Sequence, residues 1–260
     1  MSDFLDHPIR IFYRISDFSQ LTINKKGKQI IKNRPSWFDK KRCLLNVIEH
    51  FPESEISILA DNVTDETISW LDKHCSHIPV ERSQYGNGAG SFQHVLKQAS
   101  DIVENRIIYF LEDDYLHLPN SEKVIKEGFK YGDYVTLFDH PDKYVNWQEG
   151  REGVAGNPLI TEDSEETRLY RTDSTHWKLT NSTVMTFAST TEIIKADMPG
   201  LEFYSKEKIT KSYPFFRTVI EKRNRKLVSS VPGMSAHIET AYMSPFTDWE
   251  AVNNSVKLDT

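Results

Sequence analysis

The sequence predicts an α/β protein with a mainly parallel central sheet flanked by helices. Through the first half of the chain, apolar strand-like runs alternate with amphipathic segments, which is the pattern of βαβ units. Polar turns accompany these runs, and ligands collect at the carboxyl ends of strands in open α/β sheets. The 260 residues contain neither an internal repeat nor a low-complexity linker. We therefore expect one domain spanning residues 1–260.

The first predicted unit is a strand, a helix and a second strand. Residues 9–13 form the first apolar strand. Residues 37–51 repeat apolar side chains at helical spacing, and Pro52 ends that helix. Residues 56–60 form the second strand, which βαβ connectivity places parallel to the first.

Two further helices and a third strand follow. Thr64 is the predicted N-cap of a helix over residues 67–73. A glycine-rich turn at 86–90 precedes a helix over residues 91–99. Residues 106–111 form a buried third strand, and three acidic residues come directly after it.

The second half of the chain has a more mixed pattern. Residues 134–138 and 182–187 are predicted strands, and residues 213–223 are a predicted helix. Residues 148–166 are polar and rich in Gly, Glu and Asp. This segment is either a mobile loop over a site or a solvated surface excursion.

Charge and composition exclude several classes of protein. The net charge of −6 and the pI near 5.9 give no basic field, so the backbone of a nucleic acid is not an expected partner. The two cysteines, Cys43 and Cys75, lack CxxC spacing and indicate buried thiols in a reducing compartment. Without an apolar leader or spanning segment, we expect a cytoplasmic protein that visits the cytoplasmic face of the membrane if its acceptor is lipid-linked.

The acidic cluster Glu112-Asp113-Asp114 is the strongest single feature of the sequence. Hard oxygen ligands placed after an apolar strand suit Mg²⁺ or Mn²⁺, with water and phosphate filling the remaining positions. The alternative is an acidic surface turn that opens a helix, with Asp114 or Asn120 as the cap.

Three segments together resemble the GT-A glycosyltransferases, and in particular bacterial enzymes that build polysaccharides and glycolipids. Residues 58–67 resemble the second-strand signature of that family, and residues 85–91 resemble its Asn/Gly-rich turn. Residues 109–116 resemble the strand that carries the DxD motif, here Glu-Asp-Asp. The resemblance covers residues 9–120 and weakens beyond residue 140. It implies a single GT-A, Rossmann-like domain.

The resemblance also implies a site for a nucleotide sugar linked to UDP, GDP or dTDP. Asp61 would bind the base, and Tyr13, Arg14 and Ser16 would line the nucleoside pocket. Asp61 could instead hold a turn or cap a helix, and Arg14 could be a solvated charge at a strand end. The predicted donor-binding residues are Tyr13, Arg14, Ser16, Asp61, Asn62, Gly88, Glu112 and Asp113.

The resemblance assigns the metal, Mn²⁺ or Mg²⁺, to Asp114 and His237. His237 follows a predicted final strand, where many GT-A enzymes place a histidine; its alternative is a structural role. The turn at 86–90 lacks the Lys-Ser/Thr of a Walker loop, which disfavours a nucleotide kinase. Its glycines allow close approach to the donor or form a tight turn.

Residues 171–178 are the predicted acceptor side, because they combine a carboxylate, an imidazole and an aromatic ring. His176 and Trp177 would contact the acceptor sugar, although Trp177 could equally be a core residue.

An inverting enzyme needs one carboxylate to remove the proton of the acceptor. Asp173 is the first candidate for this base, followed by Glu207 and Glu239. The late Glu-Asp pair of the large bacterial inverting family is not evident around residues 206–213. Inversion is expected, but the base and a retaining alternative stay open.

The predicted activity is sugar transfer from a nucleoside-diphosphate sugar to a hydroxyl of a glycan or glycolipid. Residues 1–120 would bind the donor, and residues 121–260 the acceptor. One alternative is a sugar-phosphate nucleotidyltransferase, although residues 15–20 lack the glycine-rich loop that such enzymes carry after the first strand. Another is a non-catalytic carbohydrate-binding protein. The sequence does not indicate an oligomeric state.

Overall fold

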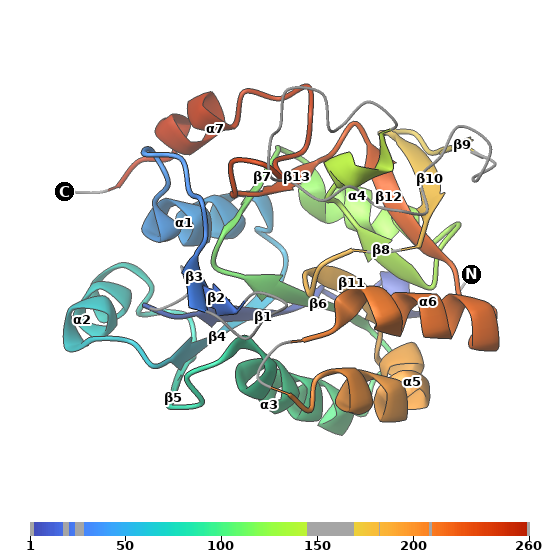
Figure 1. Cartoon of the computed structure of the whole chain (residues 1–260), viewed down its shortest axis with the longest axis horizontal. Helices are drawn as coiled ribbons and strands as arrows, with labels where there is room; N and C mark the ends of the chain where they lie inside the picture. Colours follow the sequence, from blue (N-terminus) through green and yellow to red (C-terminus); the bar gives the residue numbers. More distant parts are fainter. Residues whose placement is uncertain are drawn as a thin grey trace.

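The computed structural model describes residues 3–17, 21–23, 29–144, 169–181, 183–207 and 210–258. A nine-stranded sheet runs through the molecule (Figure 1). From one edge to the other its strands are β5 (Val80–Ser83), β4 (Glu55–Asp61), β1 (Arg10–Ile15), β6 (Ile107–Glu112), β11 (Phe187–Thr190), β8 (Tyr134–Thr136), β12 (Leu227–Val231), β10 (His176–Thr180) and β9 (Leu169–Arg171). Only β11 and β10 run against the other strands, so the mainly parallel α/β class is confirmed.

Helices cover both faces of this sheet. They are α1 (Lys40–His50), α2 (Asp65–His74), α3 (Gly88–Asp101), α4 (Ser121–Gly128), α5 (Thr191–Tyr204), α6 (Ser212–Arg223) and α7 (Trp249–Ser255), with 3₁₀ turns η1 (Asp3–Leu5) and η2 (Pro141–Lys143). Apolar side chains of α3, α5 and α6 pack on one face, and those of α1, α2 and α4 pack on the other. No helix in the described ranges is long and apolar enough to cross a membrane.

Two small antiparallel pairs stand apart from the main sheet. They are β7 (Tyr115–His117) with β13 (Ser235–His237), and β2 (Leu21–Ile23) with β3 (Gln29–Ile31). The main sheet takes its strands from both predicted halves of the chain. The division into a donor half and an acceptor half remains a prediction.

The predicted elements of the first half are confirmed with small changes at their ends. The predicted helix over residues 37–51 begins at Lys40, because Asp39 caps it by accepting from the N–H of Lys41. Thr64 caps α2 as expected, with its Oγ1 accepting from the N–H of Thr67 at 3.4 Å.

The glycine-rich turn is largely part of a helix, which corrects the expected start at residue 91. Asn87 is the N-cap of α3, and its Oδ1 accepts from the N–H of Gly90 at 2.8 Å. A Cβ at Gly90 would lie 2.9 Å from Cβ of Tyr85, so close packing explains this glycine. Arg14, near the end of β1, donates to the carbonyl of Gly88, so the first turn of α3 lies at the edge where the strands end.

The strand expected at residues 182–187 is wrong by several residues. Strand β11 begins at Phe187, and Ser182 lies outside the described residues. Thr186 instead accepts a 3.3 Å hydrogen bond from the N–H of Glu112. Helix α5, with Pro199 inside it, was not predicted. The polar segment 148–166 lies outside the described residues.

Candidate functional site

The candidate site lies where strands β1, β4 and β6 end. The parallel registers place Arg14 opposite Glu112, and Ile15 opposite Ala60. The three strands therefore end close to one another, so the polar residues that follow them meet at one edge of the sheet. Of the predicted donor residues, those at this edge are Arg14, Ser16, Asp61, Asn62, Gly88, Glu112 and Asp113.

The three carboxylates of the acidic cluster have different partners. Glu112 pairs with Arg14, whose Nη2 lies 3.1 Å from Oε1 of Glu112. Asp113 is buried and accepts a 2.9 Å hydrogen bond from the N–H of Ser16. Across the described residues, no three histidine, cysteine or acidic side chains are arranged as a metal cluster. Of the three, Asp114 is the carboxylate that a histidine, His237, contacts among the described residues.

Asp114 is buried among three cationic or ionisable groups. Its Oδ2 accepts from Nζ of Lys32 at 2.9 Å, from Nη2 of Arg34, and from Nε2 of His237 at 3.1 Å. Its Oδ1 is buried and has no hydrogen-bond partner among the described residues. Burial alone would raise the pKa of Asp114, but Lys32, His237 and Arg34 hold that pKa well below its usual range.

The neighbouring carboxyl group behaves in the opposite way. Burial, and then the charge of Asp114, raise the pKa of Asp113 to about 6, against the lowering effect of the N–H of Ser16. Two adjacent buried carboxylates repel each other, so an added positive charge in this site would favour the ionised form of both.

His237 reaches Asp114 through a small sheet. Strand β13 pairs with β7 so that His237 stands opposite Tyr115, and the two rings stack with centroids 5.3 Å apart. The N–H of Ile238 also donates to the backbone carbonyl of Asp114 at 2.8 Å. Oε2 of Glu239 lies 3.9 Å from Nδ1 of His237. The predicted metal residues and one predicted base are thus brought together.

Asp61 shapes the turn beside this edge. Its carboxylate accepts from Oγ of Ser83 at 2.9 Å and from the N–H groups of Tyr85 and Gly86 at 2.6 and 3.0 Å. Gly86 has a φ of +65°, which favours glycine. The turn-holding alternative therefore describes Asp61 in this structure, while contact with a base stays a prediction.

Arg14 is a buried residue that links β1 to α3, which excludes the alternative of a solvated charge. Its Nη1 donates to the carbonyl of Gly88 at 3.0 Å and to Oγ of Ser91 at 3.3 Å. The guanidinium also lies 5.4 Å from the centroid of the Phe92 ring. Arg14 therefore fixes the start of α3 against the acidic cluster.

Tyr13 does not line an open pocket, which corrects its predicted role. Its side chain is fully buried, and burial raises its pKa well above the usual range. Its hydroxyl has no hydrogen-bond partner among the described residues.

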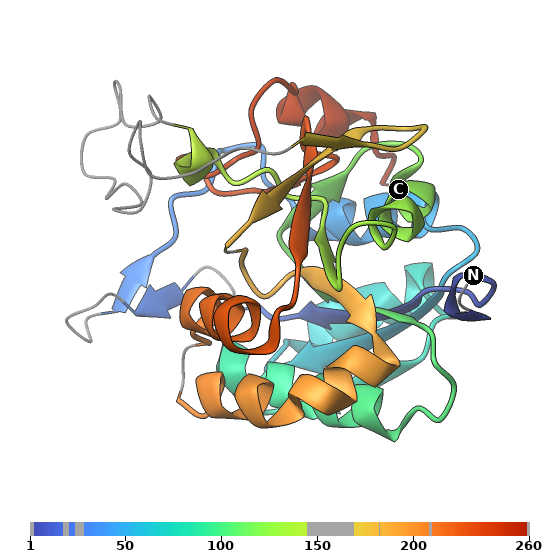
Figure 2. The same cartoon turned by 90° about the vertical axis from the view of Figure 1, so that its right-hand side faces the viewer.

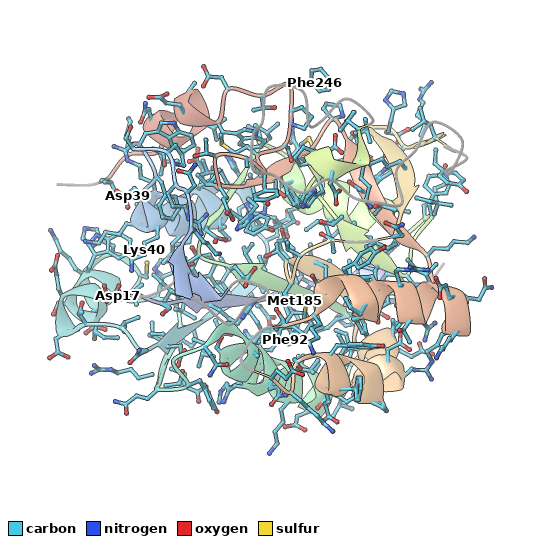
Figure 3. All side chains as sticks on the ribbon, viewed as in Figure 1. Asp17, Asp39, Lys40, Phe92, Met185 and Phe246 are labelled. Atoms are coloured by element: carbon cyan, nitrogen blue, oxygen red, sulfur yellow. The ribbon has the colours of Figure 1, made fainter. Side chains whose placement is uncertain are left out.

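Asp17 is a site-edge residue that the sequence analysis missed. It accepts from the N–H of Thr64 at 2.6 Å and from Oγ1 of Thr67 at 2.9 Å, and it pairs with Lys40 (Figure 3). Burial would raise its pKa, but Lys40 and the donors from Thr64 and Thr67 lower it to about 2. Asp17 thus ties the end of β1 to the first turns of α1 and α2.

Neither predicted acceptor residue contacts Asp114 or His237 among the described residues. Trp177 is fully buried, and its Nε1 donates to Oγ1 of Thr172 at 3.0 Å, so it is a core residue with no exposed face for a sugar. His176 is exposed at the start of β10. The acceptor role of Trp177 is therefore corrected, and that of His176 stays a prediction.

Two of the three predicted bases make no contact with Asp114 or His237 among the described residues. Asp173 is exposed in the turn between β9 and β10, where Oγ of Ser174 donates to Glu127 of α4 at 2.7 Å. Figure 2 shows this turn on one side of the molecule and the β2–β3 hairpin on the other. Glu207 is exposed and pairs with Lys211 at 2.7 Å. Only Glu239 is placed beside His237.

Lys32 and Arg34 are the main functional candidates that the sequence analysis missed. Both contact Asp114, 82 and 80 residues further along the chain. The available signal was a run of basic residues over positions 25–34 that follows the first strand. Such a run is usually a solvated surface, so only the fold identifies these two side chains.

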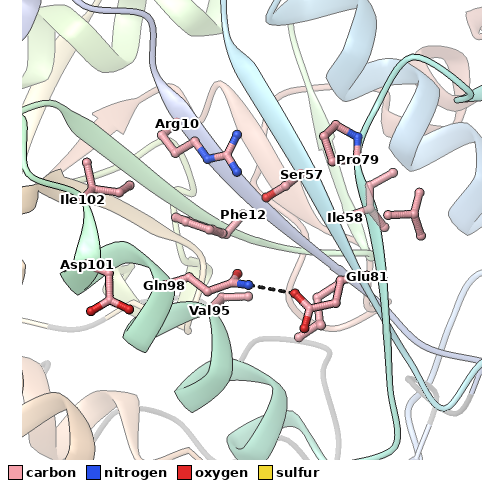
Figure 4. A pocket seen from close by; sticks show the side chains of 12 residues that line it. Arg10, Phe12, Ser57, Ile58, Pro79, Glu81, Val95, Gln98, Asp101 and Ile102 are labelled. Atoms are coloured by element: carbon pink, nitrogen blue, oxygen red, sulfur yellow. Dashed lines mark hydrogen bonds between the residues drawn. The ribbon is translucent and has the colours of Figure 1, made fainter.

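A separate groove of about 420 Å³ lies between α3 and strands β1, β4 and β5 (Figure 4). Arg10, Phe12 and Ser57 line it, and Nε2 of Gln98 donates to Glu81 at 2.7 Å across it. Arg10 and Ser57 lie near the amino ends of their strands. The groove is therefore distinct from the site at the carboxyl ends.

The chain shares its fold with a proposed glucose-1-phosphate thymidylyltransferase from Bacillus anthracis, solved with sucrose. The two match with a TM-score of 0.51 at 12% identity, over 97% of this chain and 98% of the other. At this identity the match shows a common fold and nothing about activity. The expected GT-A-like, Rossmann-like fold is confirmed at that level.

Two glycosyltransferase structures, TarS and LgtC, are also similar to this chain. TarS of S. aureus matches with a TM-score of 0.47 at 13% identity, over 85% of this chain and 35% of TarS. The galactosyltransferase LgtC, solved with donor and acceptor sugar analogues, matches with a TM-score of 0.44 at 9% identity, over 85% and 72% of the two chains. These scores are too low to support an argument. Neither a family model nor a curated protein matches the chain.

Proposed function

We propose that this protein transfers a sugar from a nucleoside-diphosphate sugar to a hydroxyl of a glycan or glycolipid acceptor. One observation carries the proposal: a buried carboxylate, Asp114, lies 3.1 Å from His237 at the strand ends where open α/β sheets bind ligands. Asp61, Arg14 and the start of α3 border the same edge. The resemblance of residues 9–120 to GT-A enzymes supports the same assignment.

We further propose that Asp114 and His237 hold Mn²⁺ or Mg²⁺. The residues fit such a cation, because Oδ1 of Asp114 is buried without a partner among the described residues. A buried polar atom left unpaired costs about 1–3 kcal/mol, and a cation would satisfy it. An oxygen and an imidazole nitrogen are suitable ligands, with water and phosphate completing the set. When bound, the cation would neutralise charge on the departing nucleoside diphosphate.

The protein groups around this position would supply orientation. Arg14 neutralises Glu112 and holds the first turn of α3, while Asp61 fixes the turn at Tyr85 and Gly86. These contacts make the rim of the donor site rigid before a ligand arrives. Pre-set geometry of this kind lowers the entropic cost of reaching a reactive arrangement.

Glu239 is our candidate for the base that removes the acceptor proton. It lies beside His237, and its side chain is 19% exposed, so it can reach an incoming hydroxyl. Asp173 and Glu207 are exposed, and neither contacts Asp114 or His237 among the described residues. A single carboxylate acting on the acceptor is the arrangement that an inverting transfer requires.

Nucleotidyl transfer to a sugar phosphate is the second candidate, because the Bacillus anthracis structure with the same fold is described as a proposed thymidylyltransferase. The two reactions differ in their products. A glycosyltransferase releases a nucleoside diphosphate from a nucleotide sugar, whereas a nucleotidyltransferase releases pyrophosphate from a nucleoside triphosphate and a sugar phosphate. Assays with both substrate sets on one preparation would separate them.

The first experiment is a thermal-shift screen of UDP, GDP and dTDP and their sugars with Mn²⁺, Mg²⁺ or chelator. A ligand that binds the native state raises the melting temperature. We expect one base series to stabilise the parent only with metal, and to fail with Asp114→Asn and His237→Gln. Asp65→Asn is the matched control, because that carboxylate is exposed on α2. Equal stabilisation of all four proteins would exclude the proposed site.

A further inference from the structure

We propose that Lys32 and Arg34 are the diphosphate-binding residues of the donor site and exchange Asp114 for the phosphates when donor and metal bind. This inference rests on the proposed function. The supporting observation is that Lys32 and Arg34 both contact Asp114, the carboxylate that would bind the proposed cation.

The segment 32–34 lies across the site. Nζ of Lys32 and Nη2 of Arg34 both donate to Oδ2 of Asp114. Nη1 of Arg34 donates to the carbonyl of Ile238, and the carbonyl of Asn33 accepts from the N–H of Thr240 at 2.8 Å. The backbone is thus anchored beside β13, while two cationic side chains face the acidic cluster.

The hydrogen bonding of Asp114 is uneven. Three donors converge on Oδ2, although each carboxylate oxygen offers about two lone pairs. Oδ1 of the same carboxylate and Nε of Arg34 are buried without partners among the described residues. Oδ2 therefore has more donors than lone pairs, while Oδ1 has no donor within the described part of the chain. A second ligand that took some of the donors from Oδ2, or bound Oδ1, would satisfy the hydrogen bonding of both oxygens better.

A divalent cation bound by Asp114 and His237 would repel the side chains of Lys32 and Arg34 from their present positions. Nζ of Lys32 lies 2.9 Å from Oδ2 of the same carboxylate whose Oδ1 the metal would take, and like charges this close to one another repel strongly in a buried site. The side chains of Lys32 and Arg34 are only 19% and 8% exposed, so both need another anion nearby. A diphosphate held at the same cation would be that anion.

Lys32 gives the more specific test of the two residues, because it has fewer other contacts to lose. Among the described residues, the side chain of Lys32 makes its hydrogen bond to Asp114, whereas Arg34 also bonds Ile238 and lies 4.8 Å from the ring centroid of Phe38. Lys32→Met therefore removes the charge with little loss of packing, and Lys32→Arg keeps the charge. Lys123→Met is the control, since that lysine is exposed on α4.

The test is calorimetric titration of two ligands, Mn²⁺ alone and the nucleoside diphosphate in the presence of saturating Mn²⁺. Losing a charged hydrogen bond to phosphate should weaken diphosphate binding by roughly 10-fold to 100-fold in Lys32→Met. The same variant should bind Mn²⁺ alone more tightly, because a competing cation has left Asp114. Lys32→Arg and Lys123→Met should bind the diphosphate within about threefold of the parent.

Opposite shifts for the two ligands would support the exchange, because a purely structural role weakens both. Unchanged diphosphate binding in Lys32→Met, with a parent that binds normally, would overturn this inference and leave the proposed function standing. A parent that binds no nucleoside diphosphate at any metal concentration would instead overturn the proposed function. Arg34→Met, tested only if thermal unfolding shows that it is folded, should repeat the Lys32→Met pattern.

Discussion

The two sides of the candidate site are held by different kinds of contact. Arg14 and Asp61 lie near the carboxyl ends of β1 and β4, Asp113 directly follows β6, and a few hydrogen bonds with nearby turns fix them. His237 and Glu239 reach the site only because β13 pairs with β7 more than 110 residues away, as the 123-residue separation of His237 and Asp114 shows. The first side follows from local pattern, whereas the second depends on tertiary pairing.

The largest expected effect concerns the side that tertiary pairing supplies. Glu239→Gln should lower the transfer rate by about 10²–10⁴-fold, the usual contribution of a general base, while donor binding stays near the parent value. The measurement is the initial rate of nucleoside diphosphate release with acceptor, together with the Kd of the donor. Asp173→Asn is the matched control and should keep nearly the parent rate, because Asp173 is exposed in a distant turn. If Asp173→Asn lowered the rate more than Glu239→Gln, the catalytic base would lie within residues 171–178 instead.

The local side can be tested through its packing. Gly90→Ala should lower the free energy of unfolding by about 1–3 kcal/mol, because the added Cβ would lie 2.9 Å from Cβ of Tyr85. Gly88→Ala, in the same helix turn, has no atom within 4 Å of its added Cβ and should be neutral or slightly stabilising. Urea unfolding of both variants checks the pair. Equal effects would show that the turn at Tyr85 does not hold α3 in place.

A pH titration tests how β1 is tied to α1 and α2. The pKa of Asp17 is lowered to about 2 in the folded protein, so its contribution is present above the ordinary pKa near 3.8 and is lost as the pH falls through 2. Asp17→Asn should remove up to about 2 kcal/mol of the free energy of unfolding at pH 6 and much less near pH 2. Urea unfolding between pH 2 and 6 measures this difference. If Asp17→Asn lowered the free energy of unfolding by the same amount at every pH, the negative charge of Asp17 would not stabilise its contacts with Lys40 and Thr64.

The sequence predicts the fold class and the strand-end geometry well, for physical reasons. Residues 9–13, 56–60 and 106–111 are short, mostly apolar runs that alternate with helical patterns, which favours parallel buried strands whose polar successors meet at one edge. Asp114 and His237 were assigned from the family resemblance, and the structure brings them within 3.1 Å.

The remaining residues could not be placed from local pattern. Trp177 is polar-flanked in the sequence, yet the fold buries it against Gly128. Lys32 and Arg34 belong to a basic run that the sequence pattern assigns to a solvated surface, whereas in the fold both side chains contact Asp114. The strand predicted at 182–187 is shifted because Thr186 bonds the end of β6 instead of entering the sheet. Each of these outcomes depends on a partner far away in the chain.

The most direct test of the proposed metal site is an EPR titration of Mn²⁺ with the nucleoside diphosphate selected by the thermal-shift screen. The parent should bind one Mn²⁺ per chain in the presence of nucleotide, because we propose that Asp114 and His237 are its protein ligands. Asp114→Asn and His237→Gln should each lose this bound fraction, while Asp65→Asn should retain it. Equal Mn²⁺ binding by all four proteins would contradict the assignment of Asp114 and His237 as the metal site.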